Sequence, residues 1–306
     1  MMQKLRGIVP PVITPMHDDG SVDYEGLDKV VDHLIEGGMH GLFVLGSSGQ
    51  VAYLTDAERD EVIKRTVERA AGRVPVLVGT PDLTARRMVE CGRRAAALGA
   101  DAIVVTSPLY ALNDMAEIEE HFRIVAAGVD LPVYAYNVPV RVHNYLAVDM
   151  LVRLGLEGVI AGVKDSSGDD VGFRRLVQAN KAAGSPLELL TGHEVMVDGM
   201  LLLGADGAVP GLANVDPEGY ARMWEAAEAG DWTAVRDEQD RITKLFEIAF
   251  VPRGMSGDAG GIGAFKQAMA SLGVIDSPAM PAPLRALDGE CKPAIEGILR
   301  EVGLLA

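Results

Sequence analysis

Cysteine, lysine and long apolar runs are all scarce in this sequence of 306 residues. The two cysteines, Cys91 and Cys291, are too few for a disulfide scaffold and lack metal-binding spacing, so we expect a reducing, cytoplasmic location. No apolar run approaches the roughly 18 residues of a membrane-spanning helix. The first 15 residues also lack the apolar core of a signal peptide. These absences predict a protein without a membrane partner.

Basic residues are outnumbered, 28 against 44 acidic ones, which gives a formal net charge of -16. An excess of acid argues against binding to nucleic acid or to an anionic membrane. The six histidines are scattered without paired ligand spacing, which disfavours a metal-dependent enzyme. A phosphate-binding GK[ST] loop and a GxSxG nucleophile turn are also missing from the sequence.

What the chain does have is a regular alternation of β-rich runs and helical windows. The runs are apolar on both faces, as buried parallel strands are, and span 7–14, 41–46, 75–80, 102–108, 132–139, 159–166, 187–192 and 207–214. Helical windows with Thr or Asp caps, such as 55–72 and 84–100, lie between them. This pattern predicts an α/β fold, a (β/α)8 TIM barrel. We assign 1–230 to the barrel and 231–306 to a C-terminal helical extension of the same domain, with loops at 255–261 and 275–287.

A barrel of this kind carries its chemistry at the carboxyl ends of its strands. Among the eight lysines, only Lys164 falls on a predicted strand. A desolvated lysine favours its neutral form, which attacks a carbonyl carbon to make a Schiff base. The plainer alternative is a lysine whose head reaches the rim or pairs with Asp165.

Other polar residues fall at neighbouring strand ends, each with a structural alternative. Tyr136 could relay protons near the lysine, or it could simply fill the barrel, as Tyr134 could. Arg141 could hold a carboxylate by two contacts, or it could lie on the surface. The turn GSSGQ (46–50) has hydroxyls and backbone N–H groups suited to a carboxylate. His193 and Glu194 could contact a polar substrate or form a rim salt bridge.

Taken in order, these segments resemble the dihydrodipicolinate synthase / N-acetylneuraminate lyase family of class I aldolases. The resemblance runs from GIVPPVITP (7–15) through GSSGQ, YNVP (136–139) and GVKDSSGD (162–169) to GAFKQAMASLGVI (263–275). It implies that Lys164 forms the Schiff base with pyruvate or another 2-oxo acid, without a metal or an organic cofactor. It further implies that Tyr136 is the proton shuttle and that Ser47 couples it to Tyr110.

The resemblance also implies substrate contacts and an assembly. Ser48 and the backbone of Val209 would hold the pyruvate carboxylate, and Arg141 would meet the carboxylate of the aldehyde partner. Glu194 is expected to contact a polar substrate group because of its place at the end of the seventh strand, independently of the resemblance. Tyr110 would reach into a neighbouring subunit's site, within a homotetramer built as a dimer of dimers.

Several positions depart from the family pattern. Both hydroxyl positions of the turn are serine, and Gln50 replaces an acidic residue. Leu109 stands where the synthase branch commonly has a tyrosine, and Val140 where many members have a small residue. In the lyase branch an acidic residue would hold sugar hydroxyls at the position of Val195. Neither specialised substrate pocket is therefore complete.

We accordingly expect a lyase that condenses pyruvate with an aldehyde, similar to dihydrodipicolinate synthase. Arg141 and Tyr110 place aspartate semialdehyde first among the aldehydes. Cleavage of N-acetylneuraminate or of a 2-keto-3-deoxy sugar acid, or dehydration of such an acid, is the alternative. Two further alternatives are a non-catalytic 2-oxo-acid or sugar-acid binding protein on the same scaffold and an unrelated barrel enzyme that binds phosphate near strands seven and eight.

Overall fold

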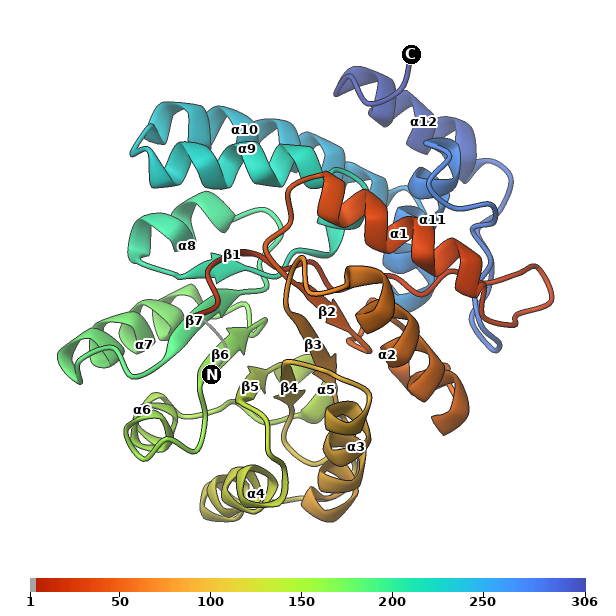
Figure 1. Ribbon diagram of the computed structural model, residues 1–306. Coiled ribbons are helices and arrows are strands. Elements are labelled where there is room, and N and C mark those ends of the chain that lie inside the picture. Colours follow the sequence, from red (N-terminus) through yellow and green to blue (C-terminus); the bar gives the residue numbers. More distant parts are fainter. Residues whose placement is uncertain (1–3) are drawn as a thin grey trace.

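Eight parallel strands form one curved sheet in a computed structural model that describes residues 4–306 (Figure 1). The strand order is β1-β8-β7-β6-β5-β4-β3-β2, so each strand from β2 onward pairs with its neighbour in the chain. The bounds are β1 Gly7–Ile8, β2 Leu42–Val44, β3 Val76–Gly79, β4 Ala102–Val105, β5 Val133–Asn137, β6 Gly162–Asp165, β7 Glu188–Thr191 and β8 Gly207–Ala208. Each lies inside a run predicted from the sequence, and the fold is the predicted (β/α)8 barrel with a C-terminal helical extension.

The barrel closes between β1 and β2 through a single isolated bridge, Pro11 with Phe43. Two hydrogen bonds flank it, from the N–H of Val12 to the carbonyl of Phe43 at 2.8 Å and from the N–H of Phe43 to the carbonyl of Pro10 at 3.0 Å. Because proline has no N–H, the pair Pro10-Pro11 cannot donate to a longer ladder. The first strand is short for that reason.

Helices surround the sheet (Figure 1), and α1, α2, α3, α4 and α7 each begin at an Asp or Thr whose side chain caps the first turn. Thr55 and Glu58 form a reciprocal capping box at the start of α2, and the Thr84 side chain caps α3. The bounds are α1 Tyr24–Glu36, α2 Asp56–Ala70, α3 Ala85–Ala97, α4 Met115–Gly128, α5 Pro139–Val142, α6 Val148–Leu156, α7 Asp170–Ala182 and α8 Val197–Leu203.

After β8 the chain is helical, as predicted, and these helices gather on one side of the barrel (Figure 1). They are α9 Pro217–Glu228, α10 Trp232–Phe246, α11 Gly263–Ser271 and α12 Cys291–Glu301, with short segments η1 Val51–Tyr53, η2 Gly211–Asn214, η3 Glu247–Phe250 and η4 Asp258–Ile262. The predicted division at residue 230 falls in the turn between α9 and α10.

The loop predicted at 255–261 is partly helical, which corrects the sequence interpretation. Residues Asp258–Ile262 form a π-helical turn that runs directly into α11. The turn is fixed by hydrogen bonds to Ser256, from the N–H of Ala259 to its hydroxyl and from the N–H of Gly260 to its carbonyl. The glycines of this segment predict a loop. In the structure the segment is instead a helical turn that continues into the buried helix α11.

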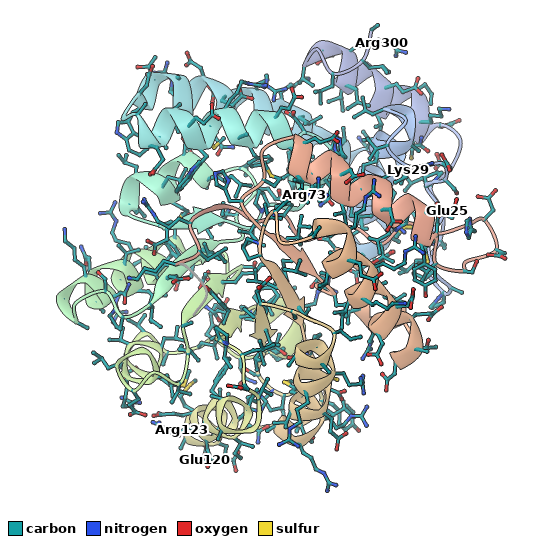
Figure 2. All side chains as sticks on the ribbon, in the orientation of Figure 1. Glu25, Lys29, Arg73, Glu120, Arg123 and Arg300 are labelled. Atoms are coloured by element: carbon teal, nitrogen blue, oxygen red, sulfur yellow. The ribbon has the colours of Figure 1, made fainter. Side chains whose placement is uncertain are left out.

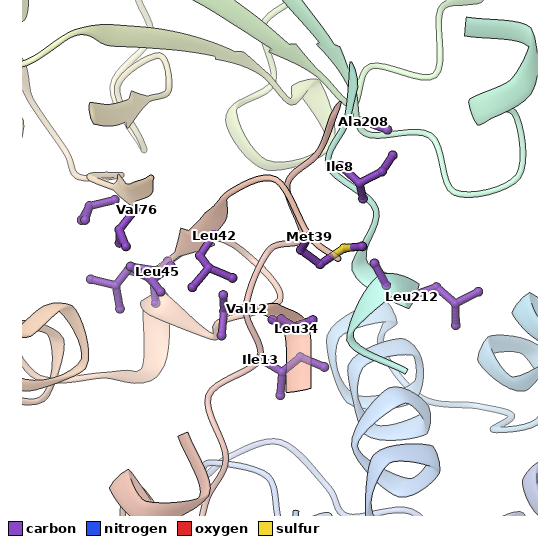
Figure 3. Packing of buried hydrophobic residues seen from close by; sticks show 14 of the residues in the cluster. Ile8, Val12, Ile13, Leu34, Met39, Leu42, Leu45, Val76, Ala208 and Leu212 are labelled. Carbon is purple, nitrogen blue, oxygen red and sulfur yellow. The ribbon is translucent and has the colours of Figure 1, made fainter. Parts of the chain in front are cut away.

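Side chains alternate between two buried clusters, as strand geometry requires. Leu42 and Val44 point outward into the layer under the helices, while Phe43 points into the barrel. Figure 3 shows part of the outer layer, in which Ile8 and Met39 lie near Leu212. Charged side chains such as Glu120 and Arg123 of α4 project at the periphery (Figure 2). The interior of the barrel is thus an apolar lining into which a few polar groups are placed.

Candidate active site

Lys164 lies inside the barrel near the carboxyl end of β6, and only 5% of it is exposed. It pairs in register with Tyr136 of β5. Its Nζ atom is 4.2 Å from the ring centroid of Tyr136 and 4.6 Å from that of Phe43. The amine therefore sits between two aromatic rings that keep bulk water away from it.

The alternative contact of Lys164 with Asp165 is not the one that forms. The carboxylate of Asp165 accepts hydrogen bonds from the amide of Asn137 at 2.7 Å and from the hydroxyl of Ser167 at 2.7 Å. Successive residues of a strand point to opposite faces, so Asp165 lies on the helix side while Lys164 lies in the barrel.

The phenol of Tyr136 is tuned by its neighbours. Burial alone would raise the pKa of Tyr136. The positive charge of Lys164 and hydrogen bonding with Ser166, Lys164 and Ser47 lower the pKa by more than burial raises it, so the net pKa is below that of a free tyrosine. Tyr136 thus lies beside Lys164, and it lines the same cavity as Ser47. A phenol with a lowered pKa gives up its proton more readily than a free tyrosine does.

The turn after β2 holds its backbone in an unusual conformation. Leu45 and Gln50 both have positive φ angles, 56° and 57°, which bulky residues rarely adopt. A hydrogen bond from Thr14 holds the turn in place: its hydroxyl donates to the carbonyl of Gly49 at 2.8 Å. Within residues 4–306, the N–H groups of Ser47, Ser48 and Gly49 donate to no protein oxygen. Such a set of free donors suits an anion.

Glu194 is half-buried, close to this turn. Its carboxylate accepts hydrogen bonds from the N–H groups of Gly211 at 2.6 Å and Leu212 at 3.1 Å. A Cβ atom on Gly211 would lie 2.9 Å from Oε1 of Glu194 and 3.4 Å from the Ser48 hydroxyl, so this close approach needs glycine. Burial raises the pKa of Glu194 to about 7, against the lowering effect of the two N–H groups. The predicted rim salt bridge forms instead between His193 and Asp170, at 3.4 Å.

Two predicted residues have other partners. The N–H of Val209 donates to the carbonyl of Thr191 at 2.7 Å, so it is not free for a substrate carboxylate. Arg141, in the short helix α5, contacts both carboxylate oxygens of Asp258, with Nη1 2.8 Å from Oδ2. The expected two-point carboxylate contact thus exists, but the carboxylate belongs to the protein.

Tyr110 is the predicted site residue that the chain does not bring to the others. It is 98% exposed, with a φ angle of 70°, and Leu112 two residues later is 97% exposed. The loop after β4 therefore projects two large side chains into solvent.

A cavity of about 440 Å³ opens beside these groups. Ser47, Phe43 and Tyr136 line its inner part, and Leu109, Tyr53 and Arg141 line its outer part. The sequence interpretation missed Asp258, which also lines the cavity, and the full burial of Lys266. Asp258 was hidden in a glycine-rich segment, and Lys266 in a helical window where lysine is usually exposed.

Among residues 4–306, no group of three or more His, Cys, Asp or Glu side chains is arranged to hold a metal ion. Over the same residues, no helix has the length and apolar character needed to cross a membrane.

Comparisons with known proteins agree on one family. The model of the dihydrodipicolinate synthetase family matches residues 4–302. An uncharacterized DapA-like lyase of Halobacterium salinarum is 36% identical over 307 residues, covering 98% of this chain and 95% of the relative. The structure of dihydrodipicolinate synthase from Bacteroides thetaiotaomicron superimposes with a TM-score of 0.92 at 33% identity, covering 98% and 100% of the two chains. Dihydrodipicolinate synthase from Acinetobacter baumannii, complexed with pyruvate, gives 0.90 at 28% identity, covering 99% and 100%.

Proposed function

Since the chain belongs to the dihydrodipicolinate synthetase family, whose relatives include lyases, we propose that it is a Schiff-base lyase that joins pyruvate, or a related 2-oxo acid, to an aldehyde. The observation that carries the proposal is the buried Lys164 amine, 4.2 Å from the ring of Tyr136. A non-catalytic binding protein has no need of an amine desolvated beside a phenol with a lowered pKa.

In the first half of the reaction, the Lys164 amine attacks the keto carbon of pyruvate. Tyr136 donates a proton to the resulting hydroxyl, which leaves as water, and the carbon–nitrogen double bond forms. The Tyr136 phenolate left by that transfer then takes up a proton from the methyl group, and the protonated imine accepts the released electron pair, giving an enamine. Ser47, which contacts Tyr136, relays the proton.

In the second half, the enamine carbon attacks the aldehyde carbon, and the aldehyde oxygen takes up a proton. Water then hydrolyses the imine and frees Lys164. The protonated imine takes up the electron pair when the enamine forms and is the electrophile in the final hydrolysis, so the cycle requires no metal or organic cofactor. The reverse sequence cleaves the carbon–carbon bond.

The pyruvate carboxylate is placed at the turn after β2. The hydroxyl of Ser48 and the free N–H groups of 47–49 supply donors there. Val209 is assigned to packing against the substrate, because its N–H already donates to Thr191. Glu194, next to Ser48, would carry a negative charge above pH 7 and favour the protonated imine.

The assembly is part of the proposal. The exposed Tyr110 and Leu112 are suited to an interface between copies of the chain, where Tyr110 would complete the proton relay of a neighbouring subunit. We propose a homotetramer, a dimer of dimers, located in the cytoplasm, where the free thiols of Cys91 and Cys291 stay reduced.

Borohydride trapping tests the Schiff base directly. The protein is mixed with pyruvate, reduced with sodium borohydride, and examined by intact mass and peptide mapping. We expect one reduced pyruvyl adduct, on Lys164, and none in the variant Lys164→Ala. Lys266 is a matched internal control, because burial lowers its pKa to about 7 and makes it a second amine that is easily neutral. Absence of an adduct on Lys164 would rule out the proposal.

A further inference from the structure

Arg141 is already occupied by a carboxylate of its own chain. Asp258 contacts it through both oxygens, and the two residues are 117 positions apart. Bidentate pairing of this kind is the strongest common contact between an arginine and a carboxylate. A substrate carboxylate that is to bind Arg141 must therefore displace Asp258 or share the guanidinium with it.

The aspartate is held in place independently of Arg141. It begins the π-helical turn η4, which is tied to Ser256 and continues into the buried helix α11. Tyr53 lies beside it, and burial together with the nearby Asp258 raises the pKa of this phenol, so Tyr53 stays a proton donor. Displacing Asp258 would leave its charge in the cavity next to the incoming carboxylate.

The other charged side chains that line the cavity are also paired with one another. Among the described residues that line the cavity, the charged ones are three arginines and three aspartates. Arg59 lies 3.6 Å from Asp56, and Arg87 lies 2.5 Å from Asp82. Each cation of the lining thus has an anion of the lining as its partner, and the formal charges cancel.

A neutralised lining of this kind offers hydrogen-bond donors and acceptors but no net attraction for an anion. A hydroxyl group can donate to Asp258 and accept from Arg141 or Tyr53 without breaking the ion pair. A carboxylate gains little from Arg141 and is repelled by Asp258. The cavity is therefore matched to neutral, hydroxylated ligands at this end.

We propose that Asp258 is a specificity-determining residue: by pairing with Arg141 it directs the enzyme to aldehydes that carry hydroxyl groups, and against aldehydes that carry a carboxylate, at the outer end of the cavity. The inference rests on the proposed function and deepens it. It argues against the order predicted from the sequence, in which Arg141 placed aspartate semialdehyde first, and favours the 2-keto-3-deoxy sugar acids as products or substrates.

The test compares two aldehydes with pyruvate at saturation. Glyceraldehyde is the neutral, hydroxylated probe, and succinic semialdehyde is the carboxylate-bearing probe. In the unmodified enzyme, kcat/KM for glyceraldehyde should exceed that for succinic semialdehyde by about tenfold or more. The nearly isosteric variant Asp258→Asn should shift this ratio toward succinic semialdehyde by about tenfold. Asp276→Asn is the matched control, because Asp276 pairs with Lys29 on the exposed surface, and it should leave the ratio unchanged.

Borohydride trapping with pyruvate on each variant distinguishes a failure of the proposed role of Asp258 from a failure of the proposed Schiff-base function. Trapping on Lys164 without any shift of the ratio in Asp258→Asn overturns the role of Asp258 and leaves the Schiff-base function standing. A preference of the unmodified enzyme for succinic semialdehyde overturns it as well. If no adduct forms on Lys164 in the unmodified protein, the proposed function itself fails.

Discussion

The Nζ atom of Lys266 donates a hydrogen bond to Oε1 of Gln50 over 2.8 Å, and both side chains are buried. A second hydrogen bond runs to the carbonyl of Ala279 at 2.9 Å. Both acceptors are neutral, so burial dominates and lowers the pKa of Lys266 to about 7. The glutamine of the turn is a neutral acceptor and leaves Lys266 without a carboxylate partner, so nothing offsets the effect of burial on the pKa of this lysine.

Replacing Gln50 by glutamate should change the pH dependence of stability. In the folded protein Lys266 releases its proton near pH 7, whereas unfolded lysine keeps it until about 10.4. The unfolded state therefore binds more protons between these values, and the free energy of unfolding should rise with pH by up to about 1.4 kcal/mol per unit. A carboxylate at position 50 raises the pKa of Lys266 and flattens this rise.

Chemical denaturation from pH 7 to 9.5 measures the effect as the difference in slope between unmodified protein and Gln50→Glu. Lys266→Met, which removes the titrating group, is the control and should also lack the slope. Equal slopes in all three proteins would contradict the assignment.

Replacing Tyr136 by phenylalanine should lower kcat by about a hundredfold or more, because the proton donor is lost. The unmodified enzyme should lose activity on the alkaline side below pH 10, since its phenol has a lowered pKa and must carry a proton to expel water. That alkaline limb should be missing from the residual activity of the variant. Tyr134→Phe is the control: Tyr134 lies on the same strand but hydrogen-bonds Glu188, and its variant should keep the limb. The same limb in Tyr136→Phe would assign it to another group.

Glu194 should impose an inflection near pH 7 on kcat/KM. Its pKa is raised to about 7, so it gains a negative charge as the pH rises through that value and then stabilises the protonated imine. Activity should rise through pH 7 in the unmodified enzyme and lose this inflection in Glu194→Gln. Because His193 adjoins it, His193→Gln is measured in parallel and should retain the inflection. Loss of the inflection only in His193→Gln would refute the role of Glu194.

Leu112→Asp should weaken the assembly and the activity together. Leu112 and Tyr110 are almost fully exposed in the single chain, and a charge at position 112 would oppose burial of this loop in an interface. Sedimentation velocity should show a smaller species for Leu112→Asp, and the turnover of this variant should be reduced. The separate variant Tyr110→Phe should slow turnover more than it weakens pyruvate binding. Val171→Asp, an equally drastic change at an exposed valine of α7, is the control. An unchanged sedimentation coefficient in Leu112→Asp would exclude this loop from the interface.

The sequence predicts the barrel well because the signal is repeated. Each strand is an apolar run between polar turns, and all eight runs contain a strand of the sheet. The position of Lys164 follows from the same signal, because a lysine inside such a run must point either into the barrel or under the helices. Its juxtaposition with Tyr136 follows from strand order and register.

Contacts between distant segments could not be predicted in this way. The partner of Arg141 lies in a segment whose glycines indicate a loop, and no local pattern joins positions 141 and 258. The burial of Lys266 depends on α11 packing inside the C-terminal helices. Both contacts are set by tertiary packing, which residue periodicity does not encode.

The single bridge that closes the barrel has a consequence for local opening of the sheet. Within residues 4–306, one bridging pair joins β1 to β2, whereas every other strand pair has two or more, and Pro10 and Pro11 cannot donate to a longer ladder. The sheet is therefore expected to open locally at this seam at low cost. Phe43, which forms that bridge, is also one of the two rings that flank the Lys164 amine. Opening of the seam would therefore expose the amine to water, and hydrogen–deuterium exchange at the amide of Phe43 would report how often the reactive centre is wetted.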